Sequence, residues 1–362
     1  MKRILNYSLF FLCMNSMALA QRAPRLSSPD VSADHKITFR YYSPTAKSVE
    51  VSGEFMPGRQ AMTKDENGVW TVTVGPIQPD IYPYSFWVDS VQLADPNNTL
   101  IFANERFKRS IVDIPGDAPL VHALQNVPHG TVSYRLYQSN TLGTTRPLLV
   151  YTPPGYDPQG NKKYPVLYLI HGGSDTEETW YKVGHMNFIA DNLIAEGKAT
   201  PMIIVMPYGN VRPAPMQDFT TDVVQEVIPY IEKNFRVLTD AGNRAIAGFS
   251  VGGGQTLNIG LTHTDLFAYI CSYAPYTATE EFKKNFTDWT PDAKKINSQL
   301  KLFTISVGKE DFLYQSVKDN LAMFKKKKII VKPYFVEGGH TWMNCKKYLA
   351  TSLQEIFRGD KK

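Results

Sequence analysis

The stretch Gly248-Phe249-Ser250-Val251-Gly252 decides the fold, because it places a serine between two glycines directly after the apolar run 245–247. That run predicts a buried strand, and the residues after Gly252 are compatible with a helix. A G-x-S-x-G pattern in this strand-turn-helix context is typical of a turn that holds a serine hydroxyl clear of a sheet. We therefore predict that Ser250 is an exposed and reactive serine.

The chain around this stretch alternates between apolar runs and amphipathic segments. The apolar runs, which predict buried strands, are residues 148–151, 166–170, 202–206, 244–247, 302–306 and 329–335. Residues 218–235 and 341–357 repeat apolar side chains at three- and four-residue spacing, which predicts helices. Strands that alternate with helices indicate an α/β domain with a doubly wound parallel sheet.

The N-terminal part has a different pattern. Short alternating strands are predicted at residues 37–41, 49–51, 69–74 and 82–88, and the dipeptide Asn67-Gly68 predicts a hairpin turn. This pattern indicates an all-β, immunoglobulin-like sandwich over residues 33–115. Because 362 residues are enough for two domains, we expect a linker at 116–129 and the α/β domain at 130–360.

The first twenty residues have the features of a secretory signal peptide. Lys2 and Arg3 precede the apolar residues 9–12, and Ala18-Leu19-Ala20 supplies small residues for cleavage before Gln21. We expect a secreted or periplasmic protein; lipid attachment at Cys13 stays an alternative, although Phe11-Leu12 is unusual before a lipidated cysteine. No later stretch has about 18 uninterrupted apolar residues, so no membrane anchor is expected.

Composition argues against several classes of partner. The net charge of +5 is modest and the lysines are scattered, apart from residues 325–328, so we expect no nucleic-acid partner. No feature of the sequence indicates an obligate protein partner. The histidines show no paired spacing on a helix face, so we predict no metal and no cofactor. Cys271 and Cys345 are too few for a disulfide-dependent scaffold, and a single bridge between them is left open.

Two residues later in the chain, an aspartate and a histidine, stand where a serine hydrolase would place the other members of its catalytic triad. In α/β-hydrolases the nucleophile comes first, an acid follows a later strand, and a histidine follows the last strand. Asp311 and His340 meet this order, with His340 as general base toward Ser250 and Asp311 orienting the imidazole. Glu310 and Glu337 are rivals of Asp311 for the acid role.

The segment His171-Gly172-Gly173 follows the predicted strand 166–170, where such enzymes place a loop that binds the developing oxyanion. We expect the backbone amides of Gly173 and Val251 to form this oxyanion hole. We expect His171 to brace the loop rather than to react.

Aromatic side chains near these positions are candidates for a substrate groove. They are Trp180, Tyr208, Tyr276 and Trp342. Trp342 is the strongest candidate, because it lies two residues after His340 on a segment that should face the site. The alternative for each of them is a place in the core.

Residues 129–357 resemble the feruloyl esterases of carbohydrate esterase family 1, the esterase-D-like α/β-hydrolases. The resemblance lies in the motifs 171–173, 190–197, 252–258, 311–313 and 337–342. It implies the same roles for Ser250, Asp311 and His340. The chain departs from the family at Val251, where methionine is common, and at Ser174, where glycine is usual, so pocket shape and loop stiffness could differ.

The N-terminal segment is similar to early-set modules related to glycogen-binding modules, through residues 39–44, 62–65 and 95–96. That similarity implies possible polysaccharide binding through Trp70 or Trp87; burial of these aromatics is the commoner explanation.

Together these features predict a secreted serine esterase that releases feruloyl groups from plant cell-wall arabinoxylan through an acyl-enzyme. Removal of acetyl groups from xylan is the close alternative, since only the acyl pocket would differ. Hydrolysis of enterobactin-type esters is more remote, and a glycan-binding protein with an inactive hydrolase scaffold is the alternative of a different class.

Overall fold

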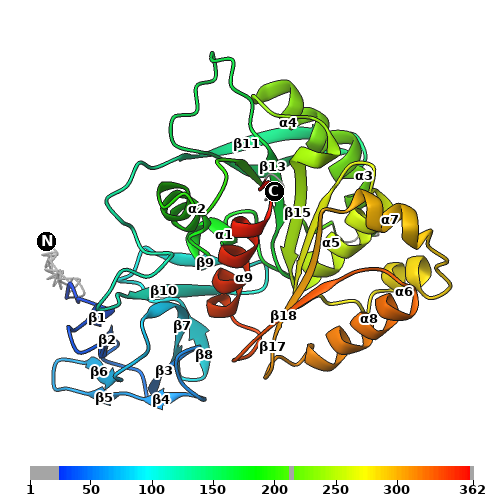
Figure 1. Ribbon diagram of the computed structural model, residues 1–362. Coiled ribbons are helices and arrows are strands. Elements are labelled where there is room, and N and C mark those ends of the chain that lie inside the picture. Colours follow the sequence, from blue (N-terminus) through cyan, green and yellow to red (C-terminus); the bar gives the residue numbers. More distant parts are fainter. Residues whose placement is uncertain (1–23, 212–215, 359–362) are drawn as a thin grey trace, which may run out of the picture.

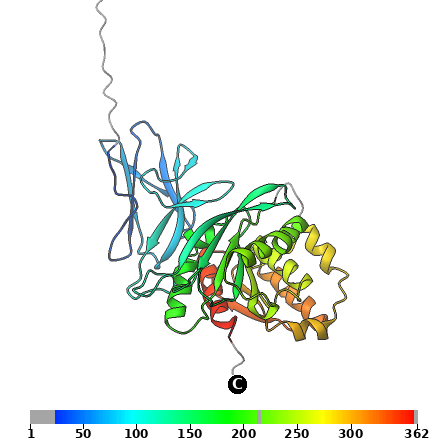
Figure 2. The ribbon, with the colours of Figure 1, turned by 90° about the horizontal axis from the view of Figure 1, so that it is seen from above.

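The computed structural model describes residues 24–211 and 216–358, so the predicted signal peptide lies outside the described residues. Figure 1 shows an all-β module, in blue, beside a larger α/β domain. Seen from above in Figure 2, the module lies against one side of the α/β domain. Among the described residues, no helix has both the length and the hydropathy needed to cross a membrane.

The N-terminal module is a sandwich of two antiparallel sheets, with strand orders β1-β2-β6-β5 and β4-β3-β7-β10-β9; β8 also pairs with β7. Its strands are β1 (Asp30–Val31), β2 (Ile37–Tyr42), β3 (Val49–Gly53), β4 (Gln60–Ala61), β5 (Thr63–Lys64), β6 (Val69–Val74), β7 (Asp80–Val88), β8 (Val91–Leu93), β9 (Ile101–Ala103) and β10 (Lys108–Ile114). The hairpin predicted at Asn67-Gly68 joins β5 to β6, with Gly68 at φ +82°. Alternate side chains such as Ile37 and Phe39 are fully buried between the sheets, as the period of two predicts.

The α/β domain is built on one eight-stranded sheet in the order β11-β12-β14-β13-β15-β16-β17-β18. Its strands are β11 (Thr131–Ser139), β12 (Thr144–Thr152), β13 (Val166–Ile170), β14 (Ile203–Pro207), β15 (Arg244–Phe249), β16 (Tyr269–Tyr273), β17 (Leu302–Gly308) and β18 (Lys332–Val336). The strands from β14 to β18 pair in parallel, whereas β12 is antiparallel to both β11 and β14. The predicted parallel sheet is present from β14 to β18, and the antiparallel strands β12 and β11 extend it at one edge. These two strands form a hairpin, because a short connection can only join antiparallel neighbours.

Helices cover this sheet on both faces (Figure 1). They are α1 (Thr179–Lys182), α2 (Met186–Ala195), α3 (Met216–Asp222), α4 (Ile228–Asn234), α5 (Val251–Thr262), α6 (Glu280–Phe286), α7 (Ala293–Gln299), α8 (Tyr314–Lys326) and α9 (Trp342–Glu355). The helix predicted at 218–235 consists of α3 and α4 joined by a π-helical turn, Val223–Val227. Residues 115–130 between the domains contain neither helix nor strand.

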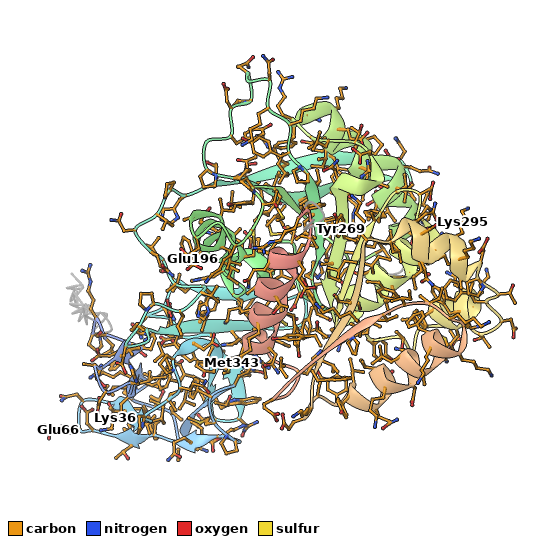
Figure 3. All side chains as sticks on the ribbon, viewed as in Figure 1. Lys36, Glu66, Glu196, Tyr269, Lys295 and Met343 are labelled. Atoms are coloured by element: carbon orange, nitrogen blue, oxygen red, sulfur yellow. The ribbon has the colours of Figure 1, made fainter. Side chains whose placement is uncertain are left out.

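The two domains share buried contacts. Ile81, Phe102 and Ile111 of the module belong to the same hydrophobic cluster as the core of the α/β domain. In return, Met343 of α9, labelled in Figure 3, packs against the core of the module. Burial of apolar surface across the junction holds the module against the α/β domain.

Candidate active site

Ser250 lies in a sharp turn between β15 and α5. Its backbone has φ 57° and ψ −116°, a conformation that costs a non-glycine residue about 1–3 kcal/mol. Hydrogen bonds hold this turn: the Ser250 amide donates to the carbonyl of Tyr273 at 2.9 Å, and its carbonyl accepts from the amides of Gly254 at 3.0 Å and Tyr276 at 2.8 Å. The strand-turn-helix context predicted for the motif is therefore present.

The two glycines of the motif are needed for space. A Cβ atom on Gly252 would lie 2.2 Å from the carbonyl oxygen of His171, and one on Gly248 would lie 2.5 Å from the carbonyl oxygen of Gly252. Any larger residue would push α5 away from the strand or from the loop after β13. The glycines thus bring Ser250 close to the His171 segment.

Asp311 and His340 are joined by a hydrogen bond. The Nδ1 atom of His340 lies 2.7 Å from Oδ2 of Asp311, and the other carboxylate oxygen accepts from the amide of Leu313 at 2.8 Å. The aspartate side chain is 1% exposed and the histidine side chain 18%. With Nδ1–H donating to the carboxylate, Nε2 of the neutral ring is left as an acceptor.

Two phenylalanines hold the imidazole. The ring of Phe249 stacks on His340 with centroids 4.4 Å apart, and the ring of Phe312 lies 4.7 Å away. Phe249 directly precedes Ser250, so the stack brings His340 to the end of β15 that carries the serine. Ser250 follows β15 and His340 follows β18, so both lie at the carboxyl edge of the parallel strands of the sheet.

Of the three carboxylates considered for the acid role, only Asp311 bonds to the imidazole. Glu337 forms a surface ion pair with Lys309 instead, with its side chain 74% exposed, and Glu310 is exposed. Burial and the 2.7 Å contact therefore favour Asp311.

The predicted oxyanion segment lies beside the serine. A Cβ atom built on Gly172 would be 3.7 Å from Cβ of Ser250, and one built on Gly173 would be 2.9 Å from Cγ2 of Val251. Gly173 therefore lies against the side chain of Val251, the residue that follows Ser250. Whether the amides of Gly173 and Val251 bind an oxyanion stays a prediction.

His171 braces this loop. Its Nε2 accepts the amide of Gly209 at 2.8 Å, so the ring proton lies on Nδ1 and donates to the carbonyl of Gly172, also at 2.8 Å. Burial lowers the pKa of His171 to about 4, which keeps the ring neutral at physiological pH. Both nitrogens are engaged in hydrogen bonds within the fold, which agrees with a structural role.

A cavity of about 180 Å³ opens next to the proposed oxyanion amides. It is lined by Glu105, Gly173, Ser174, Gly209, Asn210, Val211, Met216, Val251 and Gln255. Glu105 belongs to the module, and its carboxylate accepts a hydrogen bond from the hydroxyl of Tyr208. The wall of this cavity is therefore built by both domains.

The predicted aromatic groove is corrected in part. Trp180 is fully buried and donates its indole N–H to the carbonyl of Ile170 at 3.0 Å, while Trp342 is 4% exposed and meets Trp180 edge to face at 4.9 Å. Buried rings offer no surface to a substrate, so these two support the site from within. Tyr276 is 37% exposed beside the serine turn, and its substrate contact stays a prediction.

Sequence reasoning missed Asn104, Glu105 and Asp175. The first two lie in the module, and Asp175 lies two residues after Gly173, where it bonds to Asn104. The position of Asp175 within the loop that carries the glycine motif was a signal that could have been used. Nothing in the local sequence marks Asn104 or Glu105, because their contacts depend on how the domains dock.

Other predicted features have clear places in the structure. Cys271 and Cys345 are both buried and free, so the bridge that was left open is not formed. Trp70 is buried, and Trp87 is partly covered by the guanidinium of Arg59, 3.4 Å from the ring centroid. Within residues 24–211 and 216–358, no cluster of three or more His, Cys, Asp or Glu side chains could hold a metal ion.

The serine turn, Asp311 and His340 follow one another along the chain, and each lies beyond the carboxyl end of a strand of the same sheet. This is the arrangement of an α/β-hydrolase. The chain belongs to the putative esterase family, whose model matches residues 139–353. A carbohydrate-binding module 48, described as an isoamylase N-terminal domain, matches residues 27–101. The predicted fold class is thereby confirmed for both domains.

Individual relatives agree with this assignment. An endo-1,4-beta-xylanase/feruloyl esterase from Xylanibacter ruminicola is 35% identical over 68% of this chain. The chain spans 36% of that relative's length, and 12% of the length of an endo-1,4-beta-xylanase Y from Acetivibrio thermocellus.

Solved structures show the same fold. A CE1 ferulic acid esterase from Anaeromyces mucronatus matches 65% of this chain and 93% of its own, with 25% identity and a TM-score of 0.56. The enterobactin esterase from Shigella flexneri matches 88% of this chain and 92% of its own at 18% identity, with a TM-score of 0.65, which supports the fold alone.

Proposed function

We propose that the protein hydrolyses carboxylic esters through an acyl-enzyme formed on Ser250. The observation that carries this proposal is the 2.7 Å bond between His340 and the buried Asp311, at the strand edge where the serine turn lies. Relatives named as feruloyl or ferulic acid esterases support the reaction class.

The chemistry follows from the roles of the three side chains. Ser250 Oγ bonds to the ester carbonyl carbon while its proton passes to Nε2 of His340, and Asp311 stabilises the imidazolium that forms. The imidazolium then protonates the departing alcohol as the ester C–O bond breaks, which leaves the acyl group on Ser250. A water molecule deprotonated by the same ring bonds to the acyl carbon, the bond to Ser250 Oγ breaks, and the ring returns the proton to that oxygen as the acid leaves. The amides of Gly173 and Val251 bind the oxyanion in both steps.

The substrate class we propose is a feruloyl or related hydroxycinnamoyl ester on plant cell-wall arabinoxylan. The relative from Xylanibacter ruminicola is named an endo-1,4-beta-xylanase/feruloyl esterase, which supports this choice. Export through the signal segment 1–20 would bring the enzyme to such a substrate; N-terminal sequencing of the mature protein should give Gln21 as the first residue.

Kinetics with purified protein test the proposal. We expect methyl ferulate to be a better substrate than a nitrophenyl acetate, and acetylated xylan to release little acetate. Ser250→Ala should lower kcat by about 10⁴-fold or more. Ser298→Ala, at an exposed serine near the end of α7, is the matched control.

Each outcome has a consequence. Activity on acetylated substrates alone would replace the feruloyl assignment with acetylxylan esterase. Unchanged activity in Ser250→Ala would remove the mechanism, and inactivity of the wild-type protein on every ester, with binding to xylan, would favour a glycan-binding protein.

A further inference from the structure

A loop of the module reaches the candidate active site. The β9–β10 loop (Asn104–Phe107) contacts the β13–α1 loop (His171–Glu178), which contains the glycine motif. The amide of Glu105 donates to the carbonyl of Ser174 at 2.8 Å, and the side-chain amide of Asn104 donates to Oδ1 of Asp175 at 2.9 Å. Asn104 is 3% exposed and Asp175 6%, so water does not compete for the side-chain bond.

The β13–α1 loop needs such support. Ser174 has φ +64°, a left-handed conformation that a non-glycine residue adopts only at a cost. Asp175 donates its amide to the carbonyl of Gly172 at 3.2 Å, and its own carbonyl accepts from the side chain of Asn210 at 2.8 Å. The loop is therefore held by contacts to both domains.

These contacts orient two peptide planes of the loop, the one between Ser174 and Asp175 and the one between Gly172 and Gly173. In a trans peptide the C=O and the following N–H point in opposite directions. Because the Ser174 carbonyl is held by Glu105, the Asp175 N–H points the other way, toward the Gly172 carbonyl. That carbonyl is held in turn by Asp175 and His171, so the Gly173 N–H points away from them. The direction of the Gly173 amide thus depends on a hydrogen bond from the module.

We propose that the N-terminal module is a positioning element of the oxyanion hole, acting through Asn104 and Glu105 on the amide of Gly173. This inference rests on the proposed function, in which that amide stabilises the transition state. It assigns the module a part in the chemical step, separate from any binding of polysaccharide. The module should therefore be needed for full activity on small esters that are too short to reach a glycan-binding surface.

Asn104→Ala tests the proposal with methyl ferulate as substrate. Loss of one oxyanion donor costs about 10²- to 10³-fold in kcat, and a donor that is kept but misplaced should cost less, about 10- to 100-fold. We expect this fall in kcat with little change in KM. Asn104→Ser, whose hydroxyl can still accept from the amide of Arg106, serves as a second variant if the alanine protein folds poorly.

A matched control separates positioning from general damage to the module. Asn98 is also an asparagine of the module, and its side chain donates to Tyr84 and to the carbonyl of Ile111, both within the module. Asn98→Ala should destabilise the module but leave kcat unchanged. Asp175→Ala should lower kcat as Asn104→Ala does, and the double variant should fall no further than the worse single one, because both remove the same bond.

The outcomes distinguish this inference from the proposed function. If Ser250→Ala is inactive while folded Asn104→Ala and Asn104→Ser keep the wild-type kcat, the positioning role is wrong and the esterase mechanism stands. An equal fall in Asn98→Ala, or additive effects of Asn104→Ala and Asp175→Ala, would also overturn it. If Ser250→Ala keeps its activity, the proposed function fails first.

Discussion

Lys346→Met removes the cation from a buried ion pair between the two domains. Lys346 of α9 pairs with Asp80 of β7, and the two side chains are 2% and 9% exposed. The Nε2 atom of His122 lies 3.6 Å from the same carboxylate oxygen. Methionine has a similar length and flexibility, so the change mainly leaves the charge of Asp80 without its partner.

We expect the variant to lose about 3–5 kcal/mol of unfolding free energy at pH 8, the usual cost of removing one partner of a buried pair. The value should lie near the lower end, because Asp80 Oδ1 still accepts the amide of Ile81 at 2.7 Å.

The loss should depend on pH through His122. Burial first, and then the charge of Lys346, lower the pKa of His122 to about 4, while Asp80 raises it. Without Lys346 the pKa rises toward its unfolded value of about 6.5. In the wild-type protein, keeping His122 neutral costs stability below its unfolded pKa of about 6.5. The higher pKa in the variant reduces this cost at pH 5.5, whereas at pH 8 the cost is absent from both proteins. The difference from wild type should therefore be smaller at pH 5.5 than at pH 8.

Urea unfolding at the two pH values measures both effects. Lys347→Met, at the exposed neighbouring lysine of α9, is the matched control and should stay within about 0.5 kcal/mol of wild type. The double variant Asp80→Asn/Lys346→Met should recover most of the loss, because no charge is then left buried. A loss below about 1 kcal/mol, an equal loss at both pH values, or an equal effect in Lys347→Met would refute the reasoning.

Three further predictions concern Asp175, Trp180 and the two cysteines. Burial raises the pKa of Asp175 to about 7, so the unfolding free energy of the wild-type protein should fall by up to about 4 kcal/mol as pH rises from about 4 to 7. This fall should be smaller in Asp175→Asn, and an equal fall in both proteins, measured by urea unfolding, would contradict the prediction. Trp180→Ala should cost about 3–5 kcal/mol of unfolding free energy with little change in KM for methyl ferulate, and a large rise in KM would restore the substrate role. Cys271 and Cys345 are buried and free, and burial raises the pKa of both thiols, so native protein should resist iodoacetamide and keep its Tm in reductant; fast labelling would count against this.

Much of the fold and of the catalytic order is visible in the sequence. The buried strands are continuous apolar runs, and the serine turn is a local sequence motif. The contact that requires Gly248 lies within the motif, at Gly252, whereas the contact that requires Gly252 is the distant carbonyl of His171. The order of Ser250, Asp311 and His340 follows from where each stands relative to a strand. Strand β12 was predicted from its apolar run, but its antiparallel direction was not, because an apolar run carries no information on its partner's orientation.

Burial was harder to predict for the large aromatics. Trp180 and Trp342 stand near the motifs in sequence, yet their rings pack edge to face inside the domain. Closeness in sequence to a catalytic motif indicates at which edge of the sheet a residue lies. The direction of its side chain depends on the helices that pack there. The same holds for Asp311, which the tertiary contact distinguishes from Glu310 and Glu337.

The sequence by itself determined the two-domain organisation, the strand-turn-helix around Ser250 and the order of the candidate catalytic residues, because each is specified by periodicity or by a local motif. Only the tertiary structure brought Asn104 and Glu105 of the module to the loop that carries Gly173. That contact joins residues about 70 positions apart through the docking of two domains. Docking depends on the shape and burial of whole surfaces, which no short stretch of sequence encodes.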